Sequence, residues 1–353
     1  MYKISIIIPL YNASIYIIRC LESVASQRYP SLECIIVDDG CSDNSVALVS
    51  DYISNYHEHI DFKMVYHEQN QGLPVARNTG IEHASGDYIF FLDADDELGK
   101  DGIAALAEPL QTQVLDFVIG ECIHIENGCP RHLEQSYPPL PHETIVEGSD
   151  ILYSYIRMKW HIQAWNKLIN KDFLLKERLF FKKELSIYED EPWTFKLACC
   201  AQTMGVTHHS CYLYHINPGS LSHRRFFPKL LTYIKLVLST CEDEVRYFRK
   251  EDDYVVINFL EARKRYYIDT LFHNKDSHPF AKRLYYETSH TLAAQNFIKQ
   301  PLSQKVKNFH AILPRWVGFY YVILLILVQK HTKLKLTKTT QFFYFLRATA
   351  LPY

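Results

Sequence analysis

Short apolar runs alternate with amphipathic stretches along the first part of the chain. Runs of branched and aromatic residues predict buried strands over 3–9, 33–37, 62–66 and 87–92. Between these runs, apolar residues recur at helical spacing over 14–27, 43–56 and 72–84. A chain that repeats strand and helix in this way predicts an α/β fold. We expect a mostly parallel, Rossmann-like sheet with right-handed crossovers and helices on its faces.

The pattern changes after residue 113. Residues 114–126 and 206–215 predict further strands, and helices are expected over 151–158 and from 171 onward. The stretch between 127 and 148 is rich in Pro, His and Glu, which predicts a loop. From 226 the sequence is helical and charged, first to about 250 and then over 253–272. The expected domains are therefore an α/β domain over 1–225, with halves 1–113 and 114–225, and a helical extension over 226–353.

Polar side chains follow three of the predicted strands, where each strand ends. Tyr11 follows the first strand, Asp39 the second, and Asp93, Asp95 and Asp96 the fourth. Ligands of open parallel sheets bind at the carboxyl ends of the strands, so we expect these groups to face one crevice. Three carboxylates within four residues repel one another, and a divalent cation with oxygen ligands would offset that repulsion. A solvated acidic turn without a metal is the alternative.

Composition narrows the classes of function only slightly. The chain has 353 residues with a net charge of −2, which gives no reason to expect nucleic-acid binding. Nine cysteines are scattered without a CxxC pair, so neither a zinc site nor a disulfide framework is indicated. A strand pattern follows Met1 at once, so no secretory signal is expected and the cytoplasm is the default location.

Two further polar positions each have two interpretations. Glu189, Asp190 and Glu191 precede Pro-Trp and an apolar helical stretch, as acids in the first turn of a helix do. They also suit a carboxylate base at the edge of a pocket, where the register within the triplet is open by one position. His124 lies among apolar residues of a predicted strand, which favours a histidine within the core over a metal ligand.

A second short apolar run lies near the C-terminus. Residues 316–328 are 13 apolar residues, fewer than the ~20 that a spanning helix needs. Trp316, Tyr320 and Tyr321 suit a membrane interface, and basic residues flank the run on both sides. We expect a peripheral segment over 312–335 on the inner face of the cytoplasmic membrane. A core helix packed on the α/β domain is the alternative.

Five segments together resemble the family 2 glycosyltransferases, the inverting nucleotide-sugar enzymes of the GT-A fold. They occur in the family's order over roughly residues 1–225, and they are SIIIPLYNASIYIIRCLESVASQ, IIVDDGCSDNS, NQGLPVARNTGIEHASGDYIFFLDADD, AWNKLINKDFL and YEDEPWTFKL. The overall likeness is to bacterial surface-polysaccharide and lipopolysaccharide transferases. Two positions depart from the usual pattern, namely Cys41 where Ser is common and His215 where Arg is common.

The resemblance implies transfer of a sugar from a nucleotide-sugar, most simply a UDP-sugar, to a hydroxyl of a glycan or lipid-linked acceptor. The departing diphosphate needs charge stabilisation by Mn²⁺ or Mg²⁺, and the acceptor hydroxyl needs a carboxylate base. The residues implied are Pro9 and Tyr11 around the nucleobase, Asp39 on its ring N–H, Arg77 on base or diphosphate, Asp93 near ribose and metal, Asp95 as metal ligand with Asp96 a weaker candidate, Asp190 as base, and Lys167, Arg224 and Arg225 as candidate diphosphate contacts.

Two other classes of function compete with this interpretation. A nucleotidyltransferase on a related sheet usually has a Gly-rich, basic loop after the first strand, whereas here Tyr11-Asn12-Ala13 has neither glycine nor a basic residue. A nucleotide-sugar-binding module without activity would need neither the acidic turn nor Asp190. The sequence therefore favours the metal-dependent glycosyltransferase.

Overall fold

The structure is a computed structural model that describes residues 1–131, 140–141, 144–217, 230–250 and 253–272. Arg224, Arg225 and the segment 312–335 lie outside these residues, so the predictions made for them stay predictions. Within the described part of the chain, no helix is both long enough and apolar enough to cross a membrane.

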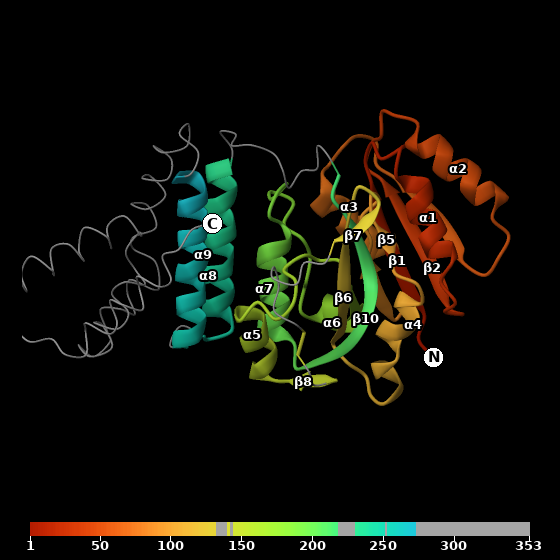
Figure 1. Cartoon of the computed structure of the whole chain (residues 1–353). Coiled ribbons are helices and arrows are strands. Elements are labelled where there is room, and N and C mark those ends of the chain that lie inside the picture. The colour runs from red at the N-terminus through yellow and green to blue at the C-terminus, as the bar shows by residue number, and fades with distance from the viewer. Residues whose placement is uncertain (132–139, 142–143, 218–229, 251–252, 273–353) are drawn as a thin grey trace, which may run out of the picture.

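A mixed sheet forms the centre of the molecule (Figure 1). Its strand order is β3-β2-β1-β4-β9-β6-β10-β5, with β7 paired to β6 and β8 to β10. β1 pairs in parallel with both β2 and β4, while β9 runs antiparallel between β4 and β6. The strands are β1 Ile4–Leu10, β2 Leu32–Asp38, β3 Asp61–Tyr66, β4 Tyr88–Phe91, β5 Glu97–Leu98, β6 Phe117–Glu126, β7 Cys129–Arg131, β8 Ile145–Glu147, β9 Lys167–Asn170 and β10 Thr203–His215.

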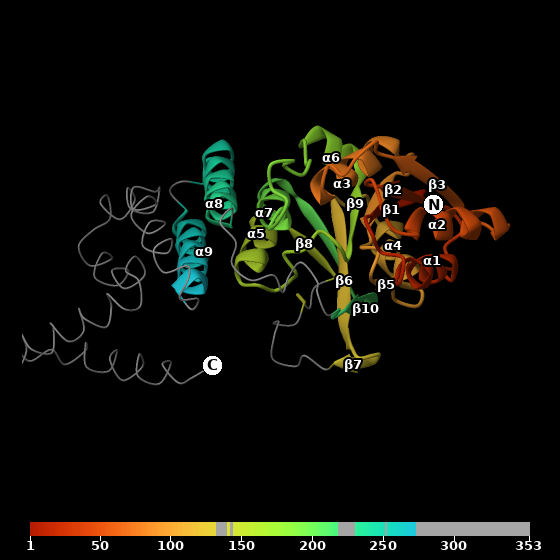
Figure 2. The same ribbon diagram turned by 90° about the horizontal axis from the view of Figure 1, so that it is seen from above.

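Helices cover both faces of the sheet. Figure 1 shows α1 and α2 on one face, α3, α5 and α7 on the other, and the pair α8 and α9 outside α7. Seen from above in Figure 2, α8 and α9 lie on the side of α7 away from the sheet. The helices are α1 Ile17–Ala25, α2 Ser45–Asn55, α3 Leu73–His83, α4 Gly102–Ala107, a 3-10 turn Pro109–Gln111, α5 Ser149–Ile156, α6 Lys171–Lys176, α7 Asp190–Cys200, α8 Leu230–Tyr247 and α9 Tyr254–Phe272.

The sheet has a hydrophobic core on each of its two faces, and this arrangement follows from strand geometry. Successive side chains of a strand point to opposite faces, so a strand buried on both sides must be apolar throughout. In β1, Ile7 belongs to the core under α3 and α7, whereas Ile6 and Ile8 belong to the core under α1. Gly80 of α3 lets that helix approach closely, because a Cβ there would lie 2.2 Å from a methyl carbon of Ile7.

The predicted fold class is confirmed: the sheet is mostly parallel, helices flank it, and helices follow it at the C-terminal side. The loop predicted over 127–148 is wrong for residues 129–131 and 145–147, which are the short strands β7 and β8. β9 is an element that the apolar pattern did not reveal. The predicted domain boundaries at 113 and 225 stay predictions.

Candidate functional site

The strand order reverses at β1, which is where the predicted crevice would lie. β2 and β4 lie on opposite sides of β1, and crossovers at such a switch point leave a space at the carboxyl ends of the strands. Leu10 is paired with Asp38 at the end of β1 and β2, so Tyr11 and Asp39 follow neighbouring strand ends. Pro9 is buried within β1, and the side chain of Tyr11 is 52% exposed at the mouth. An exposed tyrosine there can stack on a flat ring.

Asp39 is a buried carboxylate that holds the neighbouring loop. Its Oδ1 accepts hydrogen bonds from His67 Nδ1 at 2.7 Å and from the backbone N–H of Gln71 at 2.8 Å. Its Oδ2 accepts from the backbone N–H of Gly72 at 2.8 Å. Each carboxylate oxygen has two lone pairs, so Oδ2 keeps capacity for one more donor. The predicted contact of Asp39 with a nucleobase N–H stays a prediction.

The three carboxylates of the acidic turn point to different partners. Asp96 is buried and accepts from the Tyr212 hydroxyl and from the His215 backbone N–H, each at 2.7 Å. Asp95 Oδ2 accepts from Asn217 Nδ2 at 3.1 Å. Burial and the mutual repulsion of the turn raise the pKa of both Asp95 and Asp96. Among the residues that the structure describes, no three His, Cys, Asp or Glu side chains converge as a metal cage.

The turn nevertheless fits a cation held mainly by a substrate. Mg²⁺ is commonly bound by one or two carboxylates together with substrate phosphates and water. Both oxygens of Asp96 already accept hydrogen bonds, which makes it a poor ligand. Asp95 has a neutral amide as its hydrogen-bond donor, and burial with the charge of Asp93 raises its pKa. A divalent cation at Asp95 would supply the positive charge that this carboxylate lacks.

Arg77 connects the acidic turn to the N-terminus of α7. Its side chain is 1% exposed, and its guanidinium donates to Asp93 at 2.9 Å, to Glu189 at 3.0 Å and to Asp190 at 2.7 Å. The guanidinium also lies over the ring of Phe181, 5.2 Å from its centroid. Arg77 is thus placed behind the crevice, among carboxylates. Its predicted contact with base or diphosphate stays a prediction.

Three carboxylates share this single guanidinium, which leaves the group short of positive charge. Burial raises the pKa of Glu189 and of Asp190, and the charge of Arg77 lowers both pKa values. For Glu189 the neighbouring Asp190 charge adds to the rise. A carboxylate with a raised pKa accepts a proton more readily than an ordinary one, as a general base requires. The structure thus brings Asp190 together with Arg77 and Asp93.

Lys167 lies inside the protein. Its side chain is fully buried at the start of β9, so Lys167 is not a helix-capping lysine of the surface, which the sequence alone would also allow. Its Nζ donates to the backbone carbonyls of His161 at 2.9 Å and Gln163 at 2.5 Å, and it lies 5.4 Å from the Trp160 ring centroid. A contact with diphosphate would require it to leave these carbonyls, and that contact stays a prediction. Lys167 holds the segment in which the Ala164 backbone N–H hydrogen-bonds Asp190 and lowers its pKa.

Burial lowers the pKa of Lys167 from 10.5 to about 7, which predicts a pH-dependent stability. At a pH between these two pKa values, Lys167 is more fully protonated in the unfolded chain than in the folded chain. The wild-type free energy of unfolding therefore gains a contribution as pH rises from about 7 to about 10, by at most about 1.4 kcal/mol per pH unit. Lys167→Met removes that contribution.

Urea unfolding of both proteins across this pH range checks the prediction. We expect the wild type to gain stability relative to Lys167→Met with rising pH. A difference between the two proteins that stays constant would contradict a lysine of lowered pKa.

Several contacts of the site join residues far apart in the sequence. Arg19 of α1 donates to the backbone carbonyl of Asp95 at 2.7 Å and pairs with Glu97 at 3.2 Å. His215, where the family usually has Arg, contacts Glu97 Oε1 at 2.6 Å through Nε2. Glu191, the third acid of the triplet, points away from Arg77 and is bound by Arg263 of α9. Nothing in the local sequence pattern around Arg19 or Arg263 indicates these partners.

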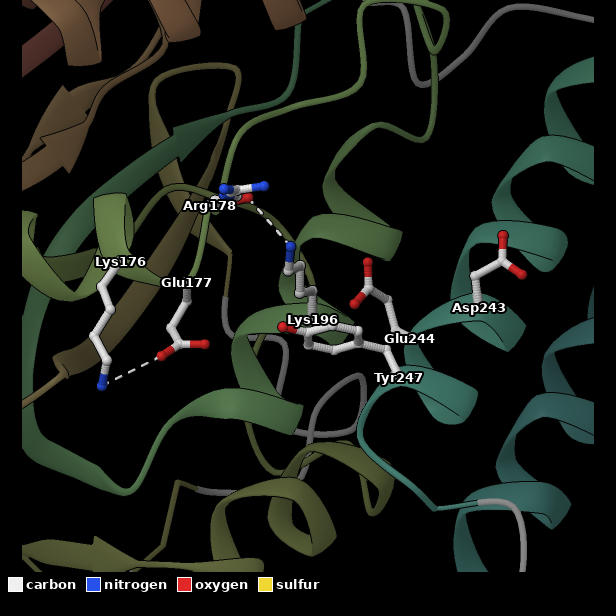
Figure 3. A pocket seen from close by; sticks show the side chains of 7 residues that line it. All are labelled: Lys176, Glu177, Arg178, Lys196, Asp243, Glu244 and Tyr247. Carbon is white, nitrogen blue, oxygen red and sulfur yellow. Dashed lines mark hydrogen bonds and ion pairs between the residues drawn. The ribbon is translucent and has the colours of Figure 1, made fainter.

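A separate pocket of about 640 Å³ lies between α7 and α8 (Figure 3). Its lining carries both signs of charge, with Lys196 from α7 and Asp243 and Glu244 from α8. Lys196 Nζ donates to the backbone carbonyl of Arg178 at 3.2 Å. None of the residues predicted for the strand-end crevice lines this pocket, so it is distinct from the candidate site.

Comparisons with known proteins indicate the family of this chain. Residues 5–167 match the sequence model of Glycosyl transferase family 2. The uncharacterized glycosyltransferase YibD of Escherichia coli (strain K12) is 33% identical over 233 residues, which cover 63% of this chain and 64% of YibD. The glycosyltransferase GlyA of Streptococcus pneumoniae serotype 4 is 30% identical over 229 residues, which cover 62% of this chain and 31% of GlyA. The chain thus spans less than two thirds of the length of either relative.

The fold is also that of solved structures. Staphylococcus aureus TarS 1–349 in complex with UDP superposes with a TM-score of 0.59 at 21% identity, covering 88% of this chain and 78% of TarS 1–349. The same protein in complex with UDP-GlcNAc gives a TM-score of 0.58, covering 82% and 91% of the two chains. The family match, the relatives and the shared fold identify residues 5–167 of this chain as a Glycosyl transferase family 2 domain on a GT-A fold.

Proposed function

We propose that this protein is an inverting, metal-dependent glycosyltransferase that moves a sugar from a UDP-sugar to a hydroxyl of an acceptor. The observation that carries the proposal is the ion-paired group in which the buried Arg77 binds both Asp93 and Asp190. It joins the strand-end crevice, where a donor binds in this fold, to a carboxylate of raised pKa. A donor site and a base in one connected group are what a single displacement needs.

The donor proposal rests on the crevice and on the solved structures of the same fold. Tyr11 is exposed directly after β1, Pro9 is buried near the end of that strand, and Asp39 Oδ2 can accept one more donor. TarS 1–349 has been solved in complex with UDP and in complex with UDP-GlcNAc. We therefore infer a uracil nucleotide stacked at Tyr11, with its ring N–H directed at Asp39.

The chemistry follows from where the charges lie. Asp190 takes the proton of the acceptor hydroxyl while that oxygen attacks the sugar carbon, whose bond to the diphosphate breaks. Asp95 would hold Mn²⁺ or Mg²⁺, and a cation bound there would offset the charge of the leaving diphosphate. Arg77 keeps Asp190 ionised, because the guanidinium charge lowers the pKa of that carboxyl. No protein nucleophile is needed for one displacement with inversion.

The acceptor proposal is a glycan or lipid-linked glycan of cell-surface polysaccharide synthesis, such as lipopolysaccharide. TarS of Staphylococcus aureus, named as a poly(ribitol-phosphate) β-N-acetylglucosaminyltransferase, is 27% identical over 219 residues and supports a polymeric surface acceptor. A lipid-linked acceptor would give the predicted contact of 312–335 with the inner face of the cytoplasmic membrane a purpose. That segment lies outside the described residues, and its membrane contact is part of the proposal.

A panel of nucleotide-sugars tests the donor. Thermal unfolding is measured with Mn²⁺ alone, with each nucleotide-sugar alone and with both together, and free sugars and UDP serve as controls. One UDP-sugar at about 100 times its dissociation constant should add ~2.7 kcal/mol of stability, since it binds the folded state only. Stabilisation by a GDP- or CMP-sugar but by no UDP-sugar would overturn the donor assignment.

A further inference from the structure

Helix α9 lies antiparallel to α7 and contacts it at successive turns. Phe259 stacks on Phe195 with ring centroids 5.8 Å apart. One turn back along α7 and one turn on along α9, Arg263 meets Glu191. Tyr267 lies a further turn along α9. Its ring contacts the ring of Tyr188, the residue two positions before α7, with the ring centroids 5.4 Å apart. The end of this row of contacts is the turn that carries Asp190.

The contact between Glu191 and α9 is a bidentate ion pair with an added hydroxyl. Arg263 Nε and a terminal nitrogen donate to the two carboxylate oxygens of Glu191 at 2.6 and 2.5 Å. The hydroxyl of Tyr267 donates to the same carboxylate at 2.5 Å. The Glu191 side chain is 4% exposed and that of Arg263 15%, so the pair is shielded from water and geometrically specific.

The first turn of α7 has little local support of its own. Glu189 stands at the N-cap position and makes no capping hydrogen bond with its side chain. Tyr188 before it has a φ of 61°, a left-handed conformation that a bulky aromatic residue keeps only where its surroundings enforce it. A helix end without a cap frays unless tertiary contacts hold it. Besides the hydrogen bond of the Ala164 backbone N–H to Asp190, ion pairs hold this end from two sides, from Arg77 and from Arg263 of α9.

The four residues of the turn divide between these two supports. Glu189 and Asp190 face Arg77, which also binds Asp93 of the nucleotide half. Tyr188 and Glu191, on either side of them, face Tyr267 and Arg263. We propose that Arg263 and Tyr267 of α9 are positioning residues for Asp190, so that the second C-terminal helix takes part in sugar transfer. This inference rests on the proposed role of Asp190 as general base.

Arg263→Met in the full chain tests the inference. The methionine keeps an unbranched apolar side chain in place of the arginine stem and removes both hydrogen bonds to Glu191. Turnover should fall by roughly 10²-fold, the loss that a small misplacement of a reacting group produces, with the KM for the UDP-sugar unchanged. Hydrogen exchange of residues 186–193 should become faster, while exchange in β1, β2 and β4 stays the same.

Arg246→Met is the matched control, because Arg246 is itself exposed and its ion pairs, with Glu242 and Asp243, lie within α8 and do not reach α7. It should leave turnover, KM and exchange unchanged. Arg263→Lys, which keeps a cation beside Glu191, should recover part of the turnover, and it serves as the test variant if Arg263→Met does not fold. A folded Arg263→Met protein with wild-type turnover would overturn the inference. So would a loss of turnover accompanied by uniformly faster exchange throughout the chain.

The exchange measurement separates this inference from the proposed function. If the wild type transfers no sugar from any UDP-sugar, the proposed function fails. Faster exchange confined to 186–193 in Arg263→Met would then still show that α9 holds this turn. Unchanged exchange at 186–193 would show that it does not, whatever the wild-type activity.

Discussion

Asp190→Asn is expected to lower turnover by roughly 10²–10⁴-fold, the span typical of the loss of a general base. The amide keeps the size of the side chain and can still contact Arg77, but it cannot take a proton from an acceptor hydroxyl. The KM for the acceptor and the dissociation constant for the UDP-sugar should change little, because in the proposed mechanism Asp190 acts on the acceptor hydroxyl and makes no contact with the donor. Initial-rate kinetics and donor titration by calorimetry measure the two effects separately.

Glu189→Gln is the matched control for Asp190→Asn. Glu189 is bound by the same guanidinium, and burial with the adjacent carboxylate raises its pKa to about 8, so a neutral Gln resembles its protonated form. We expect a much smaller loss of turnover than for Asp190→Asn. An inactive Glu189→Gln protein beside an active Asp190→Asn protein would place the base one position earlier. If the Asp190→Asn protein no longer bound the UDP-sugar tightly, Asp190 would be a donor-binding residue and not the base that acts on the acceptor.

Asp95→Asn is expected to abolish turnover while leaving the folded structure intact. The change removes the carboxylate charge that would hold Mn²⁺ or Mg²⁺ and keeps the shape of the side chain and its contact with Asn217. Because burial raises the pKa of Asp95, the neutral side chain should not lower stability. The measurement is turnover against metal concentration, with thermal unfolding of the variant without ligand.

Asp101→Asn makes the same chemical change at a surface carboxylate. Asp101 pairs with the exposed Arg28, and its φ of 57° suits asparagine as well as aspartate. It should retain wild-type turnover and metal dependence. Full activity of the wild type in EDTA would contradict a metal at Asp95, and so would an Asp95→Asn protein with wild-type turnover.

The parallel half of the fold could be predicted because its strands are buried on both faces. Such strands are nearly continuous apolar runs, as β4 is throughout and β1 is apart from Ser5. β9 lacked this signal: it is four residues long and begins with a lysine. Lys167 fits a central strand only because backbone carbonyls of residues 161 and 163 surround its ammonium, and a sequence pattern does not contain that information.

The positions of the site residues could be predicted better than their partners. Strand ends follow from the apolar runs, and therefore Tyr11, Asp39 and Asp93 were expected in one crevice. The contact of Arg77 with Glu189 and Asp190 joins residues more than 110 positions apart. The contact of Glu191 with Arg263 spans 72 positions. Long-range ion pairs of this kind depend on how α3, α7 and α9 pack, which local spacing does not determine.

The identity of the first-formed products tests the central claim most directly. The UDP-sugar selected by the panel is incubated with Mn²⁺ and water as the acceptor, and proton NMR follows the products from the first minutes. From an α-linked donor, the account predicts UDP and the free sugar appearing first as the β-anomer, since one displacement inverts the configuration. The α-anomer appearing first, or UMP in place of UDP, would contradict it.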